Sequence, residues 1–239
     1  GFIIILAISF IGFQVFKLDD ISMLVRSLIL PLLTILYCLK TKDTQSYFFY
    51  FLLCYSISEF SEIFTYIQET PYIVYQIMYY GGNGLNIIAY IFLILEVLKS
   101  MDLKEIWRSY PVHIFILLAL DIYSVILVSQ VSVSSGYFVD TMEFVIEIVY
   151  NIVMMVLLTV TLINYVSRDS KKAMNLLLGA LCIVFSEVIQ VAYYYVSEQN
   201  IFIVVYSILL VLAFSFFYIQ ASMNYVKEKN YEIIGEVKS

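Results

Sequence analysis

Two carboxylate residues, Glu59 and Glu187, lie near the middle of long apolar runs of this sequence. A carboxylate at the centre of a membrane helix costs roughly 2.5–3.5 kcal/mol on insertion scales, so such residues usually face a bundle interior and mark sites or proton pathways. Where a neutral carboxylic acid lies beside an ionised one, the first can act as a proton donor and the second as a base. The chemistry that this pair predicts is therefore general acid–base catalysis.

Further polar residues are spaced to support this pair. Glu62 lies one helical turn beyond Glu59 on the same face. Arg26 is the basic residue that lies inside an apolar run, and we expect it to be the ionic partner of the acidic cluster. The acidic residues in apolar runs outnumber this single arginine, so we expect at least one glutamate to be protonated at neutral pH.

A structural interpretation of these charges stays open as well, because a buried ionic network can fix helix register without any chemistry. Glu143, Glu147 and Asn151 follow one another at helical spacing and form a polar stripe that either borders the site or faces water. The three cysteines lie in apolar runs, and no CxxC, HExxH, P-loop or Rossmann motif occurs. We therefore expect neither a metal nor a cofactor.

The composition indicates that a membrane positions these residues. Of 239 residues, 62% are hydrophobic and 13% are charged, whereas soluble domains are roughly 45–50% apolar and ~25% charged. This balance excludes an ordinary soluble fold, and the absence of a basic stripe argues against a nucleic-acid partner. A bilayer core of ~30 Å requires about 20 mostly apolar residues per helix. We predict an all-α, polytopic membrane helix bundle of about eight transmembrane helices, at residues 1–16 (a truncated first helix), 21–39, 46–67, 72–98, 110–129, 142–166, 173–196 and 201–224.

The positions of the basic residues predict the orientation of the bundle. Eleven of the 13 Lys and Arg residues lie in the connections after the second, fourth and sixth predicted helices or in the C-terminal tail. Positive residues are retained on the cytoplasmic side, so we expect both termini to be cytoplasmic. The bundle would form a single domain at 1–224, followed by a cytoplasmic tail at 225–239. The pattern Leu-Cys-x3-Ser-Glu occurs at 53–59 and 181–187, and this faint repeat suggests two halves, 1–100 and 105–224.

Short motifs along the chain carry a family resemblance. The segment 179–187 reads Gly-Ala-Leu-Cys-Ile-Val-Phe-Ser-Glu, and Ser58 and Glu59 form a second Ser-Glu pair. Tyr150 is followed by Met154. These features resemble the YhhN family of lysoplasmalogenase-like membrane proteins, which shows Gly-Ala-…-Ser-Asp, Gly-Asp and Tyr-x3-Met at these places. The resemblance extends over about residues 20–222, and it implies an integral, multi-pass protein of the bacterial inner (cell) membrane.

The resemblance implies hydrolysis of the vinyl-ether bond of a lysoplasmalogen, which releases a fatty aldehyde and a glycerophospho-headgroup. Glu59 and Glu187 would be the catalytic pair. Arg26, which stands where the family has Lys, would hold one carboxyl ionised or bind the phosphate, and Tyr90, which stands where the family has His, would donate a hydrogen bond. Further candidates for substrate binding are Glu62, Tyr150 and Asn151. The expected partner is a membrane lipid, namely a lysophospholipid substrate.

A non-enzymatic function is the alternative. A lipid-binding, transport or scaffold protein of the same fold would carry the same buried acids, because intramembrane carboxyls also relay protons in transporters. Transporters often have broken helices near the membrane midplane, and the segment Gly81–Gly84 is a place where a helix could kink. A hydrolase should have a blind pocket that contains both glutamates, whereas a transporter should open alternately to both faces. The oligomeric state is left open.

Overall fold

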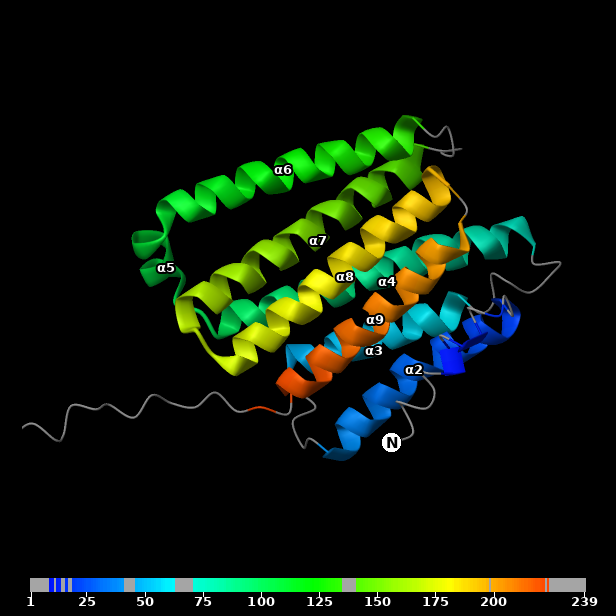
Figure 1. Ribbon diagram of the computed structural model, residues 1–239, viewed down its shortest axis with the longest axis horizontal. Helices are drawn as coiled ribbons and strands as arrows, with labels where there is room; N and C mark the ends of the chain where they lie inside the picture. Colours follow the sequence, from blue (N-terminus) through cyan, green and yellow to red (C-terminus); the bar gives the residue numbers. More distant parts are fainter. Residues whose placement is uncertain are drawn as a thin grey trace, which may run out of the picture.

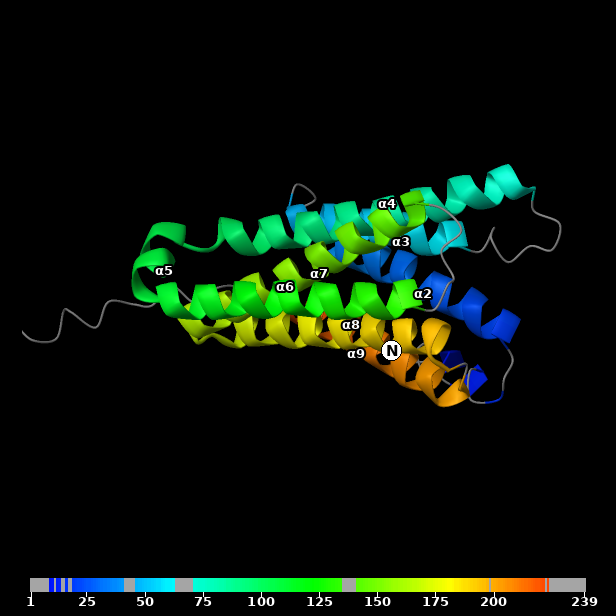
Figure 2. The same ribbon diagram turned by 90° about the horizontal axis from the view of Figure 1, so that it is seen from above.

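The chain folds into a bundle of α-helices that lie roughly side by side, as the computed structural model shows (Figures 1 and 2). The structure describes residues 9–10, 12–13, 16, 19–40, 46–62, 71–134, 141–197, 199–221 and 223. Within these ranges, every regular element is an α-helix. The predicted all-α architecture is therefore confirmed for the described residues.

The described helices are α2 (Asp19–Lys40), α3 (Tyr47–Glu62), α4 (Tyr72–Lys99), α5 (Leu103–Ser109), α6 (Pro111–Ser134), α7 (Thr141–Arg168), α8 (Lys171–Tyr195) and α9 (Asn200–Ala221). All except α5 correspond to spans predicted from the sequence. The predicted span at 1–16 falls mostly outside the described residues. Helix α4 continues through Gly81–Gly84 as one helix of 28 residues, so the glycines do not break it.

Five of these helices, namely α4, α6, α7, α8 and α9, are long and apolar enough to cross a membrane. They indicate a multi-pass membrane protein. Helix α2 contributes a shorter apolar stretch, Ser27–Leu39. Helix α3 has only 16 residues, so the described helices do not establish the predicted number of eight spans.

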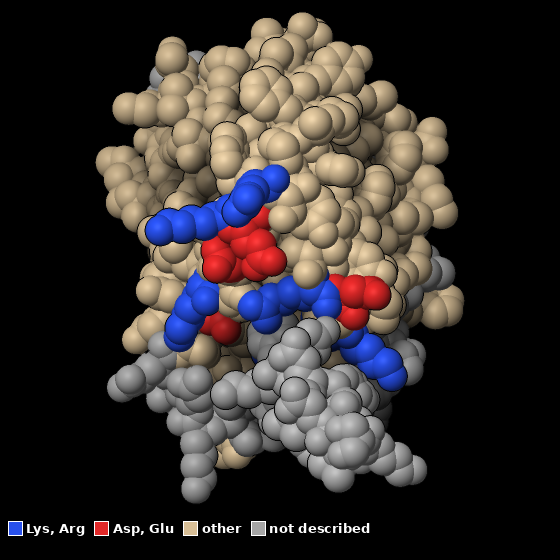
Figure 3. All heavy atoms as spheres, turned by 90° about the vertical axis from the view of Figure 1, so that its left-hand side faces the viewer, with Lys and Arg blue, Asp and Glu red and all other residues tan. Residues whose placement is uncertain are grey.

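Charged side chains gather at one end of the bundle. Helix α4 ends there with Lys99, the last turn of α5 contains Arg108 and α7 ends with Arg168. Figure 3 views this end and shows blue Lys and Arg side chains beside red Asp and Glu side chains. We call it the basic end. The connections at the opposite end, residues 63–71, 135–140 and 196–199, contain no Lys or Arg.

Local signals define the helix boundaries at the basic end. The side chain of Asp102 accepts hydrogen bonds from the backbone N–H groups of Lys104 and Glu105, at 3.0 and 3.2 Å, and so caps the start of α5. Ser170 caps α8 in the same way, because its Oγ accepts from the backbone N–H of Ala173 at 3.2 Å. Between α7 and α8, Asp169 has a φ of 41°, the left-handed conformation with which helices commonly end.

An aromatic core holds α3 against α9. The ring of Phe51 lies 5.6 Å from that of Phe217 in an edge-to-face arrangement and 6.4 Å from that of Phe214. Tyr55 continues this cluster, at 5.1 Å from Phe214. Aromatic pairs of this geometry contribute about 0.5–1.5 kcal/mol beyond the area that they bury. The core thus fixes the part of α3 that leads to Glu59.

Polar side chains also link neighbouring helices. Thr34 on α2 and Ser56 on α3 share a hydrogen bond of 2.7 Å. Thr159 on α7 donates to a carboxylate oxygen of Asp121 on α6 at 2.8 Å. Such bonds between membrane helices contribute modestly, about 0.6 kcal/mol on average. They nevertheless select one rotational position for each helix, since an unpaired polar group facing lipid is unfavourable.

Candidate functional site

Glu59 on α3 and Glu187 on α8 have a common neighbour in the bundle interior. Glu59 is 3% exposed, and Glu187 is half-buried. Both carboxyl groups lie close enough to Tyr55 for their charges to act on its hydroxyl group. Tyr55 precedes Glu59 by one helical turn on α3. Two carboxyls that are distant in the sequence therefore lie near the same tyrosine.

A row of tyrosine rings connects α3, α4 and α7 beside these acids. The rings of Tyr55 and Tyr90 lie 5.7 Å apart, and those of Tyr90 and Tyr150 lie 5.8 Å apart, both edge to face. Tyr90 is fully buried at 0% exposure. Its hydroxyl group is close to those of Tyr55 and Tyr150 but forms no well-aligned hydrogen bond with a described residue. The charge of Glu187 also acts on Tyr90 and Tyr150.

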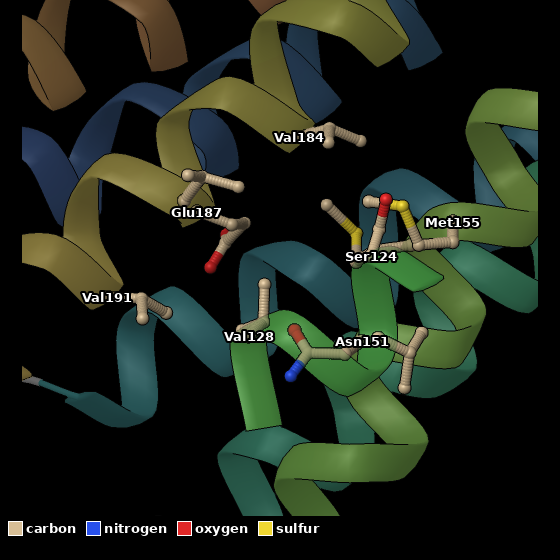
Figure 4. Close-up of a pocket in the computed structure, with 10 residues that line it drawn as sticks. Ser124, Val128, Asn151, Met155, Val184, Glu187 and Val191 are labelled. Atoms are coloured by element: carbon tan, nitrogen blue, oxygen red, sulfur yellow. The ribbon is translucent and has the colours of Figure 1, made fainter. Parts of the chain in front are cut away.

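A small cavity lies between α6, α7 and α8, and Glu187 forms part of its wall. Figure 4 shows Glu187 from α8 and Asn151 from α7 reaching toward the same space, with Ser124 on the side of α6. The cavity volume is about 20 Å³, which is enough for about one water molecule. Pockets for drug-sized ligands measure ~300–1,000 Å³. In this conformation the cavity admits water and excludes a lipid.

The polar stripe on α7 reaches this cavity. Asn151 Nδ2 donates a hydrogen bond to Glu147 Oε1 at 3.4 Å, while the Asn151 side chain lines the cavity beside Glu187. Glu143 lies one turn closer to the start of α7. The stripe therefore borders the candidate site, which was one of the two positions that the sequence allowed for it.

Two buried serines position the two glutamates in a similar way. Ser58 Oγ donates to the backbone oxygen of Gly82 on α4 at 2.9 Å. Ser186 Oγ donates to the backbone oxygen of Tyr206 on α9 at 3.4 Å. Both serines are 0% exposed, and each directly precedes a glutamate. Each bond ties a glutamate-bearing helix to the next helix in the chain, at the two places where the Leu-Cys-x3-Ser-Glu pattern recurs.

The predicted site residues fall into two groups. The charges of Glu59 and Glu187 act on Tyr55, and that of Glu187 acts on Tyr90 and Tyr150. Asn151 joins Glu187 at the cavity, whereas Glu59 does not line it, so the described residues do not form the expected pocket with both glutamates in this conformation. The side chains of Arg26 and Glu62 lie outside the described residues. The predicted pairing of Arg26 with the acidic cluster therefore remains a prediction.

Sequence reasoning missed the central position of Tyr55 and the contribution of α6 to the cavity wall. The position of Tyr55 beside Glu59 could have been predicted, because Tyr55 precedes Glu59 by four residues and so shares its helix face. Ser124 on α6 has no such signal, since α6 is apolar around most of its circumference. No group of three or more His, Cys, Asp or Glu side chains that could hold a metal ion occurs among the described residues.

Comparisons with known proteins leave the family open. No family model, no curated protein and no solved structure matches the chain. The assignment of a function therefore depends on the chemistry of the site.

Proposed function

We propose that this chain is a membrane-embedded hydrolase of the lysoplasmalogenase type, which cleaves the vinyl-ether bond of a lysophospholipid with Glu59 and Glu187 as its acid–base pair. The observation that carries the proposal is that both carboxyls lie near Tyr55, while Glu187 also lines a cavity of the size of one water molecule. Vinyl-ether hydrolysis needs a proton donor, a base and one water, and these are the components that the site can supply.

The proposed reaction begins with proton transfer from the neutral carboxyl of the pair to the vinyl carbon remote from the ether oxygen. An oxocarbenium ion forms, and the ionised carboxyl stabilises it as the corresponding carboxylate does in glycosidases. That carboxylate then takes a proton from water as the water oxygen bonds to the cationic carbon. The resulting hemiacetal passes its hydroxyl proton to the carboxylate that donated the first proton and breaks its bond to the glycerol oxygen, which takes the proton that the base gained from water. The products are a fatty aldehyde and the glycerophospho-headgroup.

The tyrosines near Glu187 support an assignment of roles within this proposal. Tyr150 and Tyr90 both interact with Glu187, and phenol hydroxyl groups can donate hydrogen bonds to a carboxylate. Glu187 also faces the cavity that admits water. We therefore assign Glu187 as the base that orients the attacking water, and Glu59, which is more deeply buried, as the proton donor.

Lipid entry requires the cavity to open, and α6 is the helix suited to move. The cavity lies between α6, α7 and α8, and the most apolar stretch of α6 contains no buried residue. Helix α6 lies at one edge of the bundle in Figure 1. Its displacement from α8 would expose Glu187 to a lipid chain directly from the bilayer, without unpacking the aromatic core.

Aldehyde release from a defined substrate tests the proposal. The purified full chain in lipid nanodiscs is given 1-alkenyl-lysophosphatidylcholine or -ethanolamine, and the matching 1-acyl lipid serves as the substrate control. We expect aldehyde from the alkenyl lipids and no hydrolysis of the acyl lipid, because an acid pair can protonate a vinyl ether, whereas no Ser or Cys nucleophile with a neighbouring His base for acyl transfer is readable in the sequence. Glu59→Gln and Glu187→Gln should each lower the rate by ~10²-fold or more.

The matched control is Glu96→Gln. Glu96 lies in the last turns of α4 at the basic end, where it is half-buried and interacts with Lys172, so this variant removes the charge of a partly buried carboxyl outside the row of tyrosines. We expect it to retain wild-type activity. An equal loss in all three Gln variants would show that burial of charge, and not acid–base chemistry, causes the loss. Full activity in both Glu59→Gln and Glu187→Gln would refute the mechanism.

The size of the cavity favours a second candidate, a non-enzymatic lipid-binding or transport protein in which the same acids hold or relay protons. A space of about 20 Å³ suits a water molecule that bridges titratable groups. The two candidates differ in one measurement. A wild-type chain that is folded, binds lysolipid and releases no aldehyde would support the non-enzymatic function.

We further propose a topology of eight spans with both termini in the cytoplasm of a bacterial cell. The gathering of Lys and Arg at the basic end supports this orientation, as does the scarcity of basic residues in the opposite connections, which carry only Lys17. The proposed carboxyl pair would then lie deep in the bilayer, where a lysophospholipid already resides.

A further inference from the structure

We infer that a hydrated path runs along α7 from the end of the bundle opposite the basic end to the cavity beside Glu187. Glu143 and Glu147 form its entrance and Asn151 forms its inner end. The path would carry water and protons. This inference does not depend on the proposed hydrolase function, because any use of Glu187 that consumes water or exchanges protons needs such a route.

The polar groups follow one another in steps of one helical turn. Glu143, Glu147 and Asn151 are spaced by four residues on α7, so successive side chains lie about 6 Å apart along the helix axis. The hydrogen bond from Asn151 Nδ2 to Glu147 Oε1 shows that the inner two side chains point toward each other. Asn151 and Glu187 then face the same cavity. A polar side chain thus recurs at each turn from the first turn of α7 to the cavity beside Glu187.

The cavity itself is suited to water. Its volume of about 20 Å³ exceeds the ~10–15 Å³ that a single water molecule needs. Three of the side chains in its wall, Ser124, Asn151 and Glu187, are polar, and a buried water typically makes two to four hydrogen bonds.

The alternative environment for this face of α7 is lipid, and the residues argue against it. A carboxylate in the hydrocarbon region costs several kcal/mol, and Glu143 and Glu147 would incur that cost twice on neighbouring turns. The lipid-facing side of the same helix is instead marked by Val145 and Val149, which are 46% and 40% exposed. The two sides of α7 therefore differ in chemistry at the same depth.

Thiol labelling tests the path without reference to activity. A thiol reacts as the thiolate, which forms in water and not in hydrocarbon. Glu147→Cys is compared with Val145→Cys and Val149→Cys, which lie two residues to either side and so bracket its depth. Each variant is made in a full-length chain whose native cysteines are first replaced by Ala, at Cys38, Cys54 and Cys182.

The reagent is the membrane-impermeant 2-(trimethylammonium)ethyl methanethiosulfonate, applied to proteoliposomes and read by mass shift. We expect Glu147→Cys to react at least about 10-fold faster than both valine variants, although the valines are more exposed in the bundle. An equal or slower rate would overturn the inference. Reagent on the face opposite the basic end should label Glu147→Cys, whereas reagent on the basic side alone should not.

Two further variants keep the test decisive if Glu147→Cys does not fold. Glu143→Cys retains the hydrogen bond between Glu147 and Asn151, and Asn151→Cys retains both carboxylates. Both should react faster than Val145→Cys. Labelling of Glu143→Cys without labelling of Asn151→Cys would show that water reaches only the surface of the bundle. That result would also overturn a path to Glu187. Labelling is read as a mass shift of the protein and does not depend on activity. A negative labelling result can therefore be told apart from an absence of aldehyde release.

Discussion

Replacement of Gly179 by Ala should weaken the packing of α8 against α9. A Cβ atom at Gly179 would lie 2.4 Å from Cε1 and 2.5 Å from Cδ1 of Phe217, well inside van der Waals contact. The Phe217 ring cannot turn away freely, because it is 0% exposed and packs edge to face against Phe51 at 5.6 Å. Overpacking of this kind costs about 1–3 kcal/mol.

The intrinsic preference of a helix for alanine acts in the opposite direction and has to be separated from this cost. Alanine is favoured over glycine in a helix interior by up to about 1 kcal/mol. Gly84 on α4 supplies the matched control, since a Cβ there would meet nothing within 4 Å. Both variants gain the same preference, so the difference between them isolates the steric cost of about 1–3 kcal/mol.

Thermal unfolding of the purified chain in one detergent measures this difference. For a chain of this size, each kcal/mol shifts the midpoint by roughly 2–4 °C, so Gly179→Ala should unfold roughly 2–12 °C below Gly84→Ala. Phe217→Leu provides the second arm, because the smaller side chain removes the clash. In the Phe217→Leu background, Gly179→Ala should cost little. A Gly179→Ala variant as stable as Gly84→Ala, or a cost that persists without the ring, would refute the reasoning.

Two further predictions concern the membrane topology and the attachment of α6. Reporter fusions after Arg108 and after Lys172 should be cytoplasmic and one at Asp140 should be external; a cytoplasmic signal at Asp140 would contradict the eight-span topology. Asp121→Ala should destabilise the chain, and a double-mutant cycle with Thr159→Val should give a coupling of about 0.6–1.7 kcal/mol, because the two side chains form the 2.8 Å hydrogen bond between α6 and α7. Additive effects would show that this bond does not hold α6.

The positions of the long helices could be predicted from the sequence because the signal is local. A run of about 20 apolar residues specifies a membrane helix by itself, and the predicted span 72–98 coincides with α4 at Tyr72–Lys99. Helix α5 was missed because it has seven residues and no apolar run. Its signal was the cap residue Asp102 with Glu105 three positions later, a pattern that marks helix starts.

The sequence also identified the chemically unusual residues, because a carboxyl in an apolar run stands out without any knowledge of the fold. It could not identify their neighbours. That Tyr55 lies near both Glu59 and Glu187, and that Gly179 meets the ring of Phe217, are consequences of how the helices pack. In a membrane, lipid is as apolar as a leucine side chain, so hydropathy does not distinguish the face of a helix that meets lipid from the face that meets protein. The sequence by itself determined the positions of the long apolar helices and the acids within them, and the tertiary structure decided which tyrosines, which serines and which water-sized cavity lie beside these acids.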